Sequence, residues 1–517
     1  MNALLVNPKS PQTFWSFPEQ ALFSGRKALV PPLGLCTVAA LLPRNWNVKL
    51  VDLDAQELKN SHWDWADVVM ITGMIVQKHS IISLVKEAKK RNKTVVVGGP
   101  YVSSVPYEVQ AAGCDIIVRG EAEHVAESLV MALETRRSGI VIEELEKHPL
   151  TDSPIPRFDL LSMNDYLTMT IQTSRGCPFD CEFCDIVNLY GRRPRCKSPD
   201  QVIRELDCLY KLGWRREVFI ADDNFIGNRF HALAVLAHLI PWMKSHGEPF
   251  NFIVQASVNL GQDMELIDLM TEANISHVFV GVETPDQEVL RASHKYQNVN
   301  NPLIESLNTM NRNGLSVMAS FIIGFDGEKK GAGERISHFV EETSIPVVML
   351  NTLHVLPNTR LWTKLKTEGR LLEDRTSGQS TGGILNYIPT RPAREILEEY
   401  VETWNYLYES SRFLARTYRY YLSMRPTRAA AASSNGNANM PINGRPFRDI
   451  VGDVRRFTRL SLRQGLYRNS RRQYWKQIFG ILKHNPSRFV PYIVRCIMGE
   501  DMFKIRNALI KNPRAFH

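Results

Sequence analysis

Residues 176–184 read Gly-Cys-Pro-Phe-Asp-Cys-Glu-Phe-Cys and place Cys177, Cys181 and Cys184 within eight residues of one another. An extended, β-branched run at residues 166–173 comes directly before them. Thiolates clustered this tightly at the end of a strand can hold a [4Fe–4S] cluster by three of its four irons. The fourth iron then lacks a protein ligand, and in a catalytic cluster this is the place where a cofactor binds.

Two other uses of these cysteines are a zinc site and a set of disulfides. Zinc normally takes four ligands in two separated pairs, and the sequence offers no partner pair. The remaining cysteines are scattered without a pairing pattern: Cys36, Cys114, Cys196, Cys208 and Cys496. This usage is typical of a reducing compartment. The amino terminus does not read as a signal peptide, so we expect a cytoplasmic protein.

The C-x3-C-x2-C spacing resembles the signature of the radical S-adenosylmethionine (SAM) enzymes. The Arg175-Gly176 lead-in and Phe183, just before the last cysteine, fit the same pattern. The resemblance implies a [4Fe–4S] cluster held by Cys177, Cys181 and Cys184, with SAM chelated to the open iron by its amino and carboxylate groups.

Residues 1–140 alternate short β-branched strands with helices, which predicts a doubly wound, Rossmann-like parallel sheet. Ligands of such sheets sit beyond the carboxyl ends of the strands. Glycines at these ends let a flat ligand approach the backbone, although a structural turn is the other use of such a glycine. The glycines in question are Gly73, Gly98, Gly99 and Gly120.

Placed before the three cysteines, this domain resembles the cobalamin-binding module of the B12-dependent radical SAM enzymes. Residues 31–35 (PPLGL), 98–101 (GGPY) and 120–123 (GEAE) are similar to that family's recurrent turns. The resemblance implies cobalamin contacts from Gly73, Met74, Gly98, Gly99, Tyr101, Gly120 and Glu121. The chain lacks a D-x-H-x-x-G motif, and Tyr101 stands where many relatives carry histidine. We therefore expect cobalamin without a protein nitrogen on cobalt.

Residues 141–165 contain three prolines and predict a linker. Six strand–helix units follow in residues 166–370, and the resemblance implies that they form the (βα)6 partial TIM barrel of radical SAM enzymes. The helix after the cysteines has Ser198 as N-cap, Pro199 in its first turn and Gly213 past its end. The predicted strands are residues 166–173, 217–221, 251–256, 277–283, 315–323 and 347–356.

Polar side chains follow successive strands of this barrel, at the ends where active residues of barrels lie. Each one, taken singly, could be an ordinary loop residue. In this order they resemble the SAM contacts of the family, and a carboxylate such as Glu283 suits a ribose diol. The implied SAM-binding residues are Asp222, Asp223, Asn224, Gln255, Ser257, Glu283 and Gly324.

Residues 371–517 predict a basic, mainly α-helical C-terminal domain, with a low-complexity loop at residues 429–445. Residues 411–517 carry 22 Lys and Arg against 4 Asp and Glu, a net charge of +18, whereas the preceding residues carry −9. Helices that mix arginine with aromatic residues and leucine often lie on anionic membranes, and we expect peripheral membrane contact through residues 411–517. A helical cap packed on the barrel is the alternative. Nucleic acid is an unlikely partner because no RNA-binding motif is found.

Residues 177–195 (CPFDCEFCDIVNLYGRRPR) and 222–228 (DDNFIGN) resemble the branch that contains hopanoid C-2 methylases and bacteriochlorophyll side-chain methylases. The resemblance implies that SAM is cleaved to a 5′-deoxyadenosyl radical, which takes hydrogen from an unactivated carbon before methylcobalamin delivers a methyl group. It also implies an amphiphilic polycyclic substrate and an electron donor such as flavodoxin or ferredoxin. No catalytic base can be named.

Three other functions stay open at this point. One is a cobalamin-dependent radical SAM enzyme that performs a non-methylating rearrangement or cyclisation. Another is an enzyme that modifies RNA or a peptide, for which no recognition domain is found in the sequence. The third is a non-catalytic iron–sulfur or cobalamin sensor, which would leave the ordered polar strand ends unexplained.

Overall fold

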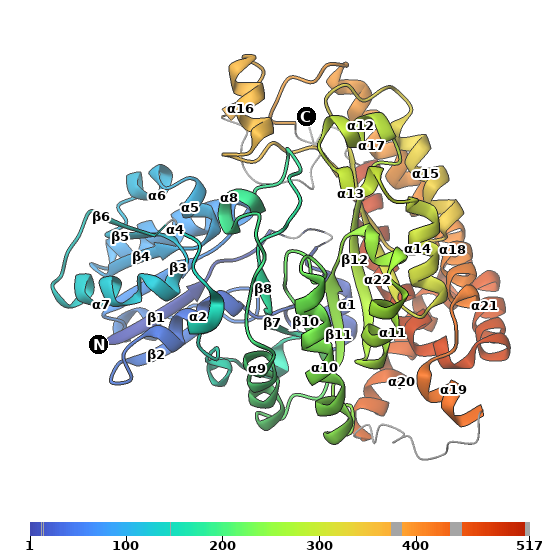
Figure 1. Ribbon diagram of the computed structural model, residues 1–517, viewed down its shortest axis with the longest axis horizontal. Coiled ribbons are helices and arrows are strands. Elements are labelled where there is room, and N and C mark those ends of the chain that lie inside the picture. The colour runs from blue at the N-terminus through green and yellow to red at the C-terminus, as the bar shows by residue number, and fades with distance from the viewer. Residues whose placement is uncertain (12, 14, 145, 374–384, 435–446, 512–517) are drawn as a thin grey trace.

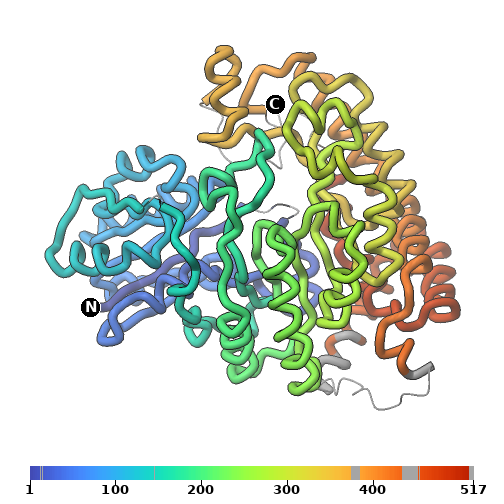
Figure 2. Tube along the Cα trace, in the orientation of Figure 1, coloured from blue at the N-terminus to red at the C-terminus, as the bar shows by residue number. Residues whose placement is uncertain are grey.

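The computed structural model describes residues 1–517 except 12, 14, 145, 374–384, 435–446 and 512–517. An N-terminal α/β domain (blue in Figure 1) lies beside a central strand–helix barrel (green to yellow), and the C-terminal helices (orange to red) pack on the far side of that barrel. The Cα trace in Figure 2 shows the same three parts. The architecture is therefore the predicted α/β fold with a helical C-terminal part.

The N-terminal sheet has six parallel strands in the order β2-β1-β3-β4-β5-β6. Alternate residues of β1 belong to two different cores, Ala3 and Leu5 to one and Leu4 and Val6 to the other. Both faces of the sheet are thus buried, as in doubly wound folds. The strands are β1 (Asn2–Asn7), β2 (Asn47–Asp52), β3 (Val68–Thr72), β4 (Thr94–Gly98), β5 (Ile116–Gly120) and β6 (Ile140–Glu144). The main helices are α2 (Leu33–Leu41), α3 (Asn60–Trp65), α4 (Lys78–Lys90), α5 (Pro100–Ser104), α6 (Tyr107–Ala111) and α7 (Ala126–Glu134).

The N-terminal sheet has a sixth strand that the sequence did not predict. β6 pairs with β5 from Ile140 to Glu144, inside the segment expected to connect the domains. As an edge strand it is only partly buried, and its two glutamates hide the apolar pattern by which the other strands were recognised. The sheet itself thus ends at residue 144.

The central sheet also has six parallel strands, in the order β7-β10-β11-β12-β13-β14. The predicted six-unit partial barrel is therefore confirmed. Its strands are β7 (Met169–Ile171), β10 (Glu217–Ile220), β11 (Asn251–Gln255), β12 (Ile275–Glu283), β13 (Ser316–Ile323) and β14 (Val348–Thr352). Its main helices are α9 (Pro199–Lys211), α10 (Arg229–Ser245), α11 (Met264–Glu272), α14 (Leu303–Arg312) and α15 (Ala332–Thr343).

Helix α9 begins as its sequence predicts. The Gln201 N–H donates to Ser198 Oγ at 3.2 Å, and the Ser198 N–H donates to Gln201 Oε1 at 2.8 Å. This capping box satisfies two helix-end donors at once. Gly213, two residues past the helix, has φ +89°, a left-handed conformation that favours glycine.

The C-terminal helices close the amino ends of the barrel strands. Arg495 of α22 is buried and donates to Ser316 Oγ at 2.9 Å, and the Val317 N–H donates to the Tyr420 hydroxyl of α18 at 2.7 Å. This part of the chain is thus a structural cap of the barrel. Its helices are α17 (Ala393–Leu407), α18 (Ser410–Ser423), α19 (Arg428–Ser434), α20 (Phe447–Leu462), α21 (Arg471–His484) and α22 (Phe489–Lys511).

The predicted loop at residues 429–445 begins inside α19, and its residues 435–446 lie outside the described part of the chain. Within the described ranges, no helix combines the length and apolar character that crossing a membrane requires.

A segment near the amino terminus lies along the first barrel strand. The Leu167 and Thr168 N–H groups donate to the carbonyls of Ala28 and Leu29 at 3.0 and 2.9 Å. Helix α1 (Pro18–Phe23) packs against α22, and the Trp15 ring makes an edge contact with Phe279 of β12, with centroids 5.4 Å apart. The sequence did not predict that residues 15–29 would join the barrel.

Candidate functional site

The three cysteines lie on a loop closed at its base by a short antiparallel pair, β8 (Ser174–Arg175) and β9 (Arg195–Cys196). The Cys177 N–H donates to the Gly191 carbonyl at 3.2 Å. Gly176 has φ +97°, and a Cβ there would lie 2.8 Å from the same carbonyl oxygen. Only glycine fits this approach of the two backbones, so the start of the loop is held in one conformation.

All three cysteines are free, partly exposed thiols, and the other five are also unpaired, so the disulfide alternative is wrong. Burial raises the pKa of Cys177 and of Cys184, so these sulfurs need a cationic partner to be thiolates. Across the described residues, no three His, Cys, Asp or Glu side chains converge to hold one metal ion. Cysteine thiolates are the ligands of a [4Fe–4S] cluster, and three partly exposed thiols on one loop supply that kind of donor.

Two side chains at the short helix α13 (Tyr296–Val299) approach these sulfurs, Gln297 within it and Lys295 just before it. The Gln297 amide donates from Nε2 to Cys181 Sγ at 3.5 Å, and Lys295 is a buried cation whose charge interacts with Cys181 and Cys184. Gln297 Oε1 is buried and has no hydrogen-bond partner within the described structure. Neither residue was predicted, since a lysine and a glutamine at a helix of four residues form no sequence motif.

Asp222 lies at the end of β10 with no exposed surface. Its carboxylate accepts hydrogen bonds from the N–H and hydroxyl of Thr173 and from the N–H and hydroxyl of Ser174, the residues that lead into the cysteine loop. Burial raises its pKa, although these four bonds oppose the shift. Asp222 therefore positions the loop, and its oxygens are already used within the protein.

Of the other predicted SAM contacts at the ends of β10 and β11, some side chains are hydrogen-bonded within the protein and others keep polar atoms that a ligand could bind. Asn224 and Ser257 hydrogen-bond each other, with Asn224 Nδ2 to Ser257 Oγ at 3.1 Å. Asp223 accepts from the Gly176 N–H at 2.8 Å through one oxygen only, and burial raises its pKa to about 6. The Gln255 carboxamide has no hydrogen-bond partner among the described residues. Asp223 and Gln255 thus keep polar atoms for a ligand.

The residues at the ends of β12 and β13 are also hydrogen-bonded within the protein. Glu283 has φ +66° and accepts from Lys295 Nζ at 2.6 Å and from the Ser320 hydroxyl at 3.3 Å. Gly324 has φ +102°, donates its N–H to Glu328 Oε2 at 2.7 Å, and accepts at its carbonyl from the Tyr387 hydroxyl. These two bonds leave about two of the four acceptor sites of the Glu283 carboxylate for a ligand.

Seven residues were predicted to contact cobalamin, and the parallel register brings Gly73, Gly98 and Gly120 to one edge of the N-terminal sheet. A Cβ at Gly99 would lie 2.2 Å from Thr72 Oγ1, and one at Gly120 would lie 1.8 Å from the Glu144 carbonyl oxygen. Those two glycines are needed for internal packing. Met74, by contrast, is an apolar side chain that is 59% exposed at the end of β3, as expected of a residue that a flat ligand would cover.

Two of the predicted cobalamin contacts have side chains that are hydrogen-bonded within the protein. Tyr101 is buried in the core of the domain and donates its hydroxyl to Glu108 Oε2 at 2.6 Å. Glu121 accepts from Arg175 at 2.8 Å and from Arg195, both on the cysteine loop's β-pair. Both side chains already have hydrogen-bond partners inside the protein, and their contact with cobalamin stays a prediction.

The carboxyl ends of the two sheets meet. Asn358, in the turn after β14, donates to the Ser104 carbonyl of the N-terminal domain at 3.1 Å. Its own carbonyl accepts from Asn188 Nδ2 of α8 (Ile186–Tyr190) at 2.6 Å. Figure 1 shows α5 and α8 side by side at this junction. A ligand beyond the N-terminal strands therefore faces the cysteine loop.

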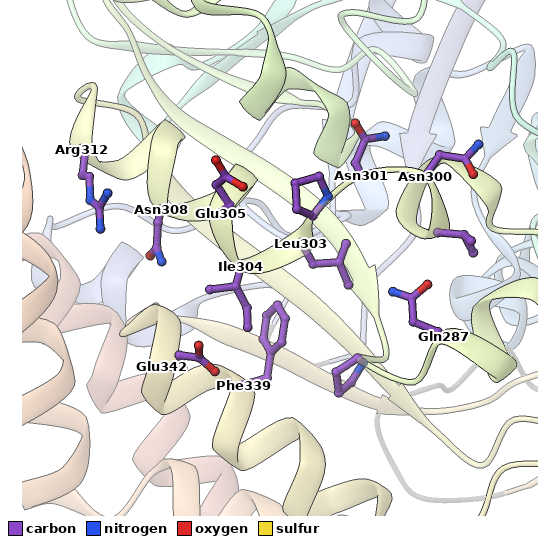
Figure 3. A pocket seen from close by; sticks show the side chains of 13 residues that line it. Gln287, Asn300, Asn301, Leu303, Ile304, Glu305, Asn308, Arg312, Phe339 and Glu342 are labelled. Atoms are coloured by element: carbon purple, nitrogen blue, oxygen red, sulfur yellow. The ribbon is translucent and has the colours of Figure 1, made fainter.

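A hollow of about 730 Å³ lies elsewhere, between α14 and α15 on the outside of the barrel (Figure 3). Its walls include Asn300, Asn301, Ile304, Asn308 and Phe339. None of the three cysteines lines it, so we assign it no part in the chemistry.

Comparison with known families agrees with this geometry. The B12 binding domain matches residues 21–130, the Radical SAM superfamily matches residues 171–340, and a domain of unknown function (DUF4070) matches residues 359–515. The predicted limits at residues 140, 165 and 370 agree in order with these matches and otherwise stay predictions.

Named relatives and solved structures extend the agreement over the whole chain. An uncharacterized methyltransferase of Synechocystis sp. is 46% identical over 98% of this chain and 92% of its own length. The hopanoid C-2 methylase of Rhodopseudomonas palustris is 37% identical over 72% of this chain and 71% of its own. The cobalamin-dependent radical enzyme OxsB with aqua-cobalamin bound shares the fold, with a TM-score of 0.60 at 15% identity over 99% of this chain and 81% of its own. The chain therefore belongs to the cobalamin-dependent radical SAM methyltransferase family.

Proposed function

We propose that this enzyme methylates an unactivated carbon of an amphiphilic polycyclic lipid of the hopanoid type. One observation carries the proposal, namely the 37% identity to a hopanoid C-2 methylase over 71% of that protein. Its relatives also include a hopanoid C-3 methylase from Methylococcus capsulatus, 26% identical over 77% of this chain and 80% of its own length. Methylation of a saturated ring requires hydrogen abstraction rather than a general base, which agrees with the lack of a candidate base in the sequence.

Different residues of the site would bind the cluster, SAM and cobalamin. Cys177, Cys181 and Cys184 hold the cluster, and Asp223 and Gln255 offer the free oxygen and amide atoms for SAM. Met74 covers one face of cobalamin, with the Gly98 backbone next to it. When bound, the cluster with SAM supplies a hydrogen-abstracting radical and cobalamin supplies the methyl group, while the protein orients both and excludes water.

The interior of the barrel suits an apolar substrate. Phe252 of β11 stacks through Phe250 on Trp242 of α10, so this face of the strand points outward. The alternate residues therefore point inward, and in neighbouring strands they include Phe219, Ile253 and Phe279. All three remain partly exposed, as the walls of an apolar chamber would be before substrate covers them.

A tetrapyrrole is the second candidate. Two bacteriochlorophyllide methyltransferases of Chlorobaculum tepidum are 22% and 23% identical over 71% and 72% of this chain. Both substrate classes are flat, large and amphiphilic, so the same apolar barrel could accept either. The lower identity ranks the tetrapyrrole second.

Two partners complete the proposal. Reduction of the cluster requires an electron donor, for which flavodoxin or ferredoxin is the chemical class. A substrate that resides in a membrane requires access to that membrane, and the basic residues 411–517 are proposed to provide it by peripheral contact.

The test uses enzyme reconstituted anaerobically with iron, sulfide and cobalamin. It is supplied with reductant, methyl-deuterated SAM and either a detergent-dispersed hopanoid or a magnesium tetrapyrrole. We expect a deuterated methyl group on the hopanoid by mass spectrometry, together with 5′-deoxyadenosine. Methylation of the tetrapyrrole alone would replace the first candidate by the second. If 5′-deoxyadenosine forms but neither compound is methylated, the polycyclic substrate class is wrong.

A further inference from the structure

One face of the C-terminal cap exposes large apolar side chains. They lie on the π-helical turn Arg463–Tyr467 and on the adjoining helix α21 (lower right in Figure 1). The Trp475 ring packs on the Gly465 backbone, where a Cβ would lie 2.9 Å from Trp475 Nε1, and this contact holds the turn and the helix together. The exposed fractions are 56% for Leu466, 82% for Tyr467, 66% for Phe479 and 44% for Leu482.

Cations lie among these apolar residues on the same side of α21. Arg472, Lys476, Phe479 and Lys483 follow one another at spacings of four, three and four residues, which places them on one face of a helix. All four are exposed, while the opposite face of α21 is buried against the rest of the cap through Tyr474, Ile478 and Ile481. This face of the helix is therefore both basic and apolar.

No acidic side chain described in this region reaches the same surface. Glu500 and Asp501 are 4% and 2% exposed, and they bind Arg468 and the N–H groups of Glu19 and Gln20. Arg472, Lys476 and Lys483 form no ion pair within the described residues. Their charge is thus uncompensated within the described protein, and it calls for an anionic partner.

We infer that this face, formed by Leu466, Tyr467 and the outward side of α21, docks on an anionic phospholipid surface. Headgroup phosphates would meet the cations, and Phe479, Leu482 and Tyr467 would enter the boundary between headgroups and acyl chains. A nucleic acid would satisfy the cations but leave the exposed leucines in water. The inference deepens the membrane contact named under the proposed function and depends on that proposal.

The docking face borders the amino-terminal segment that contacts the barrel strand β12. The Arg459 guanidinium of α20 donates to the Leu22 carbonyl at 3.3 Å, and Arg463 lies over the Phe23 ring at 4.8 Å. Helix α1 therefore borders the docking face, and Leu22 adds a side chain that is 56% exposed. Seven residues before Leu22, the ring of Trp15 contacts inward-facing Phe279. A lipid at this face is thus one short segment from the proposed substrate chamber.

The experiment uses full-length protein with point substitutions. A truncation before Ser411 would remove Tyr420 and Arg495 from the closed end of the barrel, so its failure to bind would prove nothing. The apolar variant carries Tyr467→Ser and Phe479→Ser, and the charge variant carries Arg472→Glu and Lys476→Glu. Matched controls are Phe230→Ser, whose ring is also 82% exposed but on α10, and Lys86→Glu with Lys90→Glu, two exposed lysines four residues apart on α4.

Binding is measured by co-sedimentation at low salt with vesicles of phosphatidylcholine, alone or mixed with phosphatidylglycerol. Unmodified protein and both controls should sediment with the mixed vesicles. Reversal of two surface cations, a change of four charge units, should lower the partition coefficient by at least about thirtyfold, since the loss of each cation alone is worth about fivefold. Equal binding by the charge variant and its control, or no binding by unmodified protein, would overturn the docking face.

Methylation of detergent-dispersed substrate is measured beside it and should be equal in all variants. A failure of that reaction in unmodified protein would count against the proposed substrate, whereas a failure to sediment counts against the docking face alone.

Discussion

Arg175 and Glu123 form a buried ion pair, with Nη2 2.7 Å from Oε1, although they come from different domains. Arg175 lies two residues before Cys177, and Glu123 follows the last central strand of the N-terminal sheet. The same guanidinium donates to Glu121 at 2.8 Å and to Gln172 at 2.8 Å. The cysteine loop is thus fastened to the domain that the family uses for cobalamin, so the distance between the two cofactors depends on this pair.

Changing Arg175 to Met should destabilise the folded enzyme by about 3–5 kcal/mol, because it leaves buried Glu123 without its cation and leaves Glu121 with Arg195 alone. Thermal unfolding of the variant checks this value. Exchange of the exposed Arg394 for Met, on α17, is the control and should leave the melting temperature almost unchanged. A melting temperature of the Arg175 variant equal to that of the control would show that the pair does not join the domains.

The same pair predicts a pH dependence. Burial raises the pKa of Glu123, but the hydrogen bond and charge of Arg175 outweigh burial and hold this pKa at about 2, below the usual 4.5. A depressed pKa stabilises the fold above the unfolded value and loses that effect as the pH falls through the folded value. About 3 kcal/mol should therefore disappear between pH 4.5 and pH 2. Urea unfolding at several pH values measures this loss. Between pH 4.5 and pH 2 the free energy of unfolding should change less with pH in Arg175→Met than in the unmodified protein.

The contact between Gln297 and Cys181 predicts a shift in the potential of the cluster. An N–H donated to a cluster sulfur stabilises the more negative, reduced form. Gln297→Leu removes this donor with little change in volume, and the midpoint potential should fall by about 60 mV, one decade for a one-electron couple. Redox titration followed by electron paramagnetic resonance measures the shift. Gln287→Leu, at the hollow outside the barrel, is the control, and an identical potential in both variants would reject the role of Gln297.

The hydroxyl of Tyr420 predicts a cost in stability at the closed end of the barrel. It accepts from the Val317 N–H in a fully buried place, and Phe at this position would leave that N–H without an acceptor. We expect a loss of about 1–3 kcal/mol in the free energy of unfolding. Tyr467→Phe, at an exposed position, should change nothing. Equal stability of the two variants would contradict the cap as a structural part of the barrel.

Cobalamin should bind without a protein nitrogen on cobalt. The sequence has no D-x-H-x-x-G motif, and Tyr101, which stands in the place of a histidine, points into the core toward Glu108. Electron paramagnetic resonance of the Co(II) form decides the question, because an axial nitrogen splits the signal. A spectrum with nitrogen splitting would mean that a ligand comes from elsewhere in the chain.

Most strands could be predicted from the sequence because each is a short run rich in β-branched and aromatic residues with at least one buried face. Strand β6 was not predicted, because it is a partly buried edge strand. Its two glutamates made the segment look like part of a linker. The capping of α9 was also predictable, because Ser198, Pro199 and Gln201 act within one turn of the helix.

The site was only half predictable for a related reason. The cysteines could be predicted from their spacing in the sequence, whereas the partners of Glu121 lie 54 and 74 residues away along the chain. A glutamate beside a glycine turn reads equally as a cofactor contact and as half of an ion pair. The internal hydrogen bonds of Tyr101 and Asp222 were not predictable either, since the sequence shows where a strand ends but not which hydrogen bonds the residues there make.

The measurement that tests the account most directly is SAM cleavage by single cysteine variants. Enzymes with Cys177→Ala, Cys181→Ala or Cys184→Ala are reconstituted anaerobically beside Cys36→Ala and Cys496→Ala, which change buried thiols outside the loop. The account predicts that the first three lose the visible absorbance of the cluster and form no 5′-deoxyadenosine from SAM and dithionite, while the other two keep both. Undiminished 5′-deoxyadenosine from any of the three loop variants would contradict the assignment of the cluster to Cys177, Cys181 and Cys184.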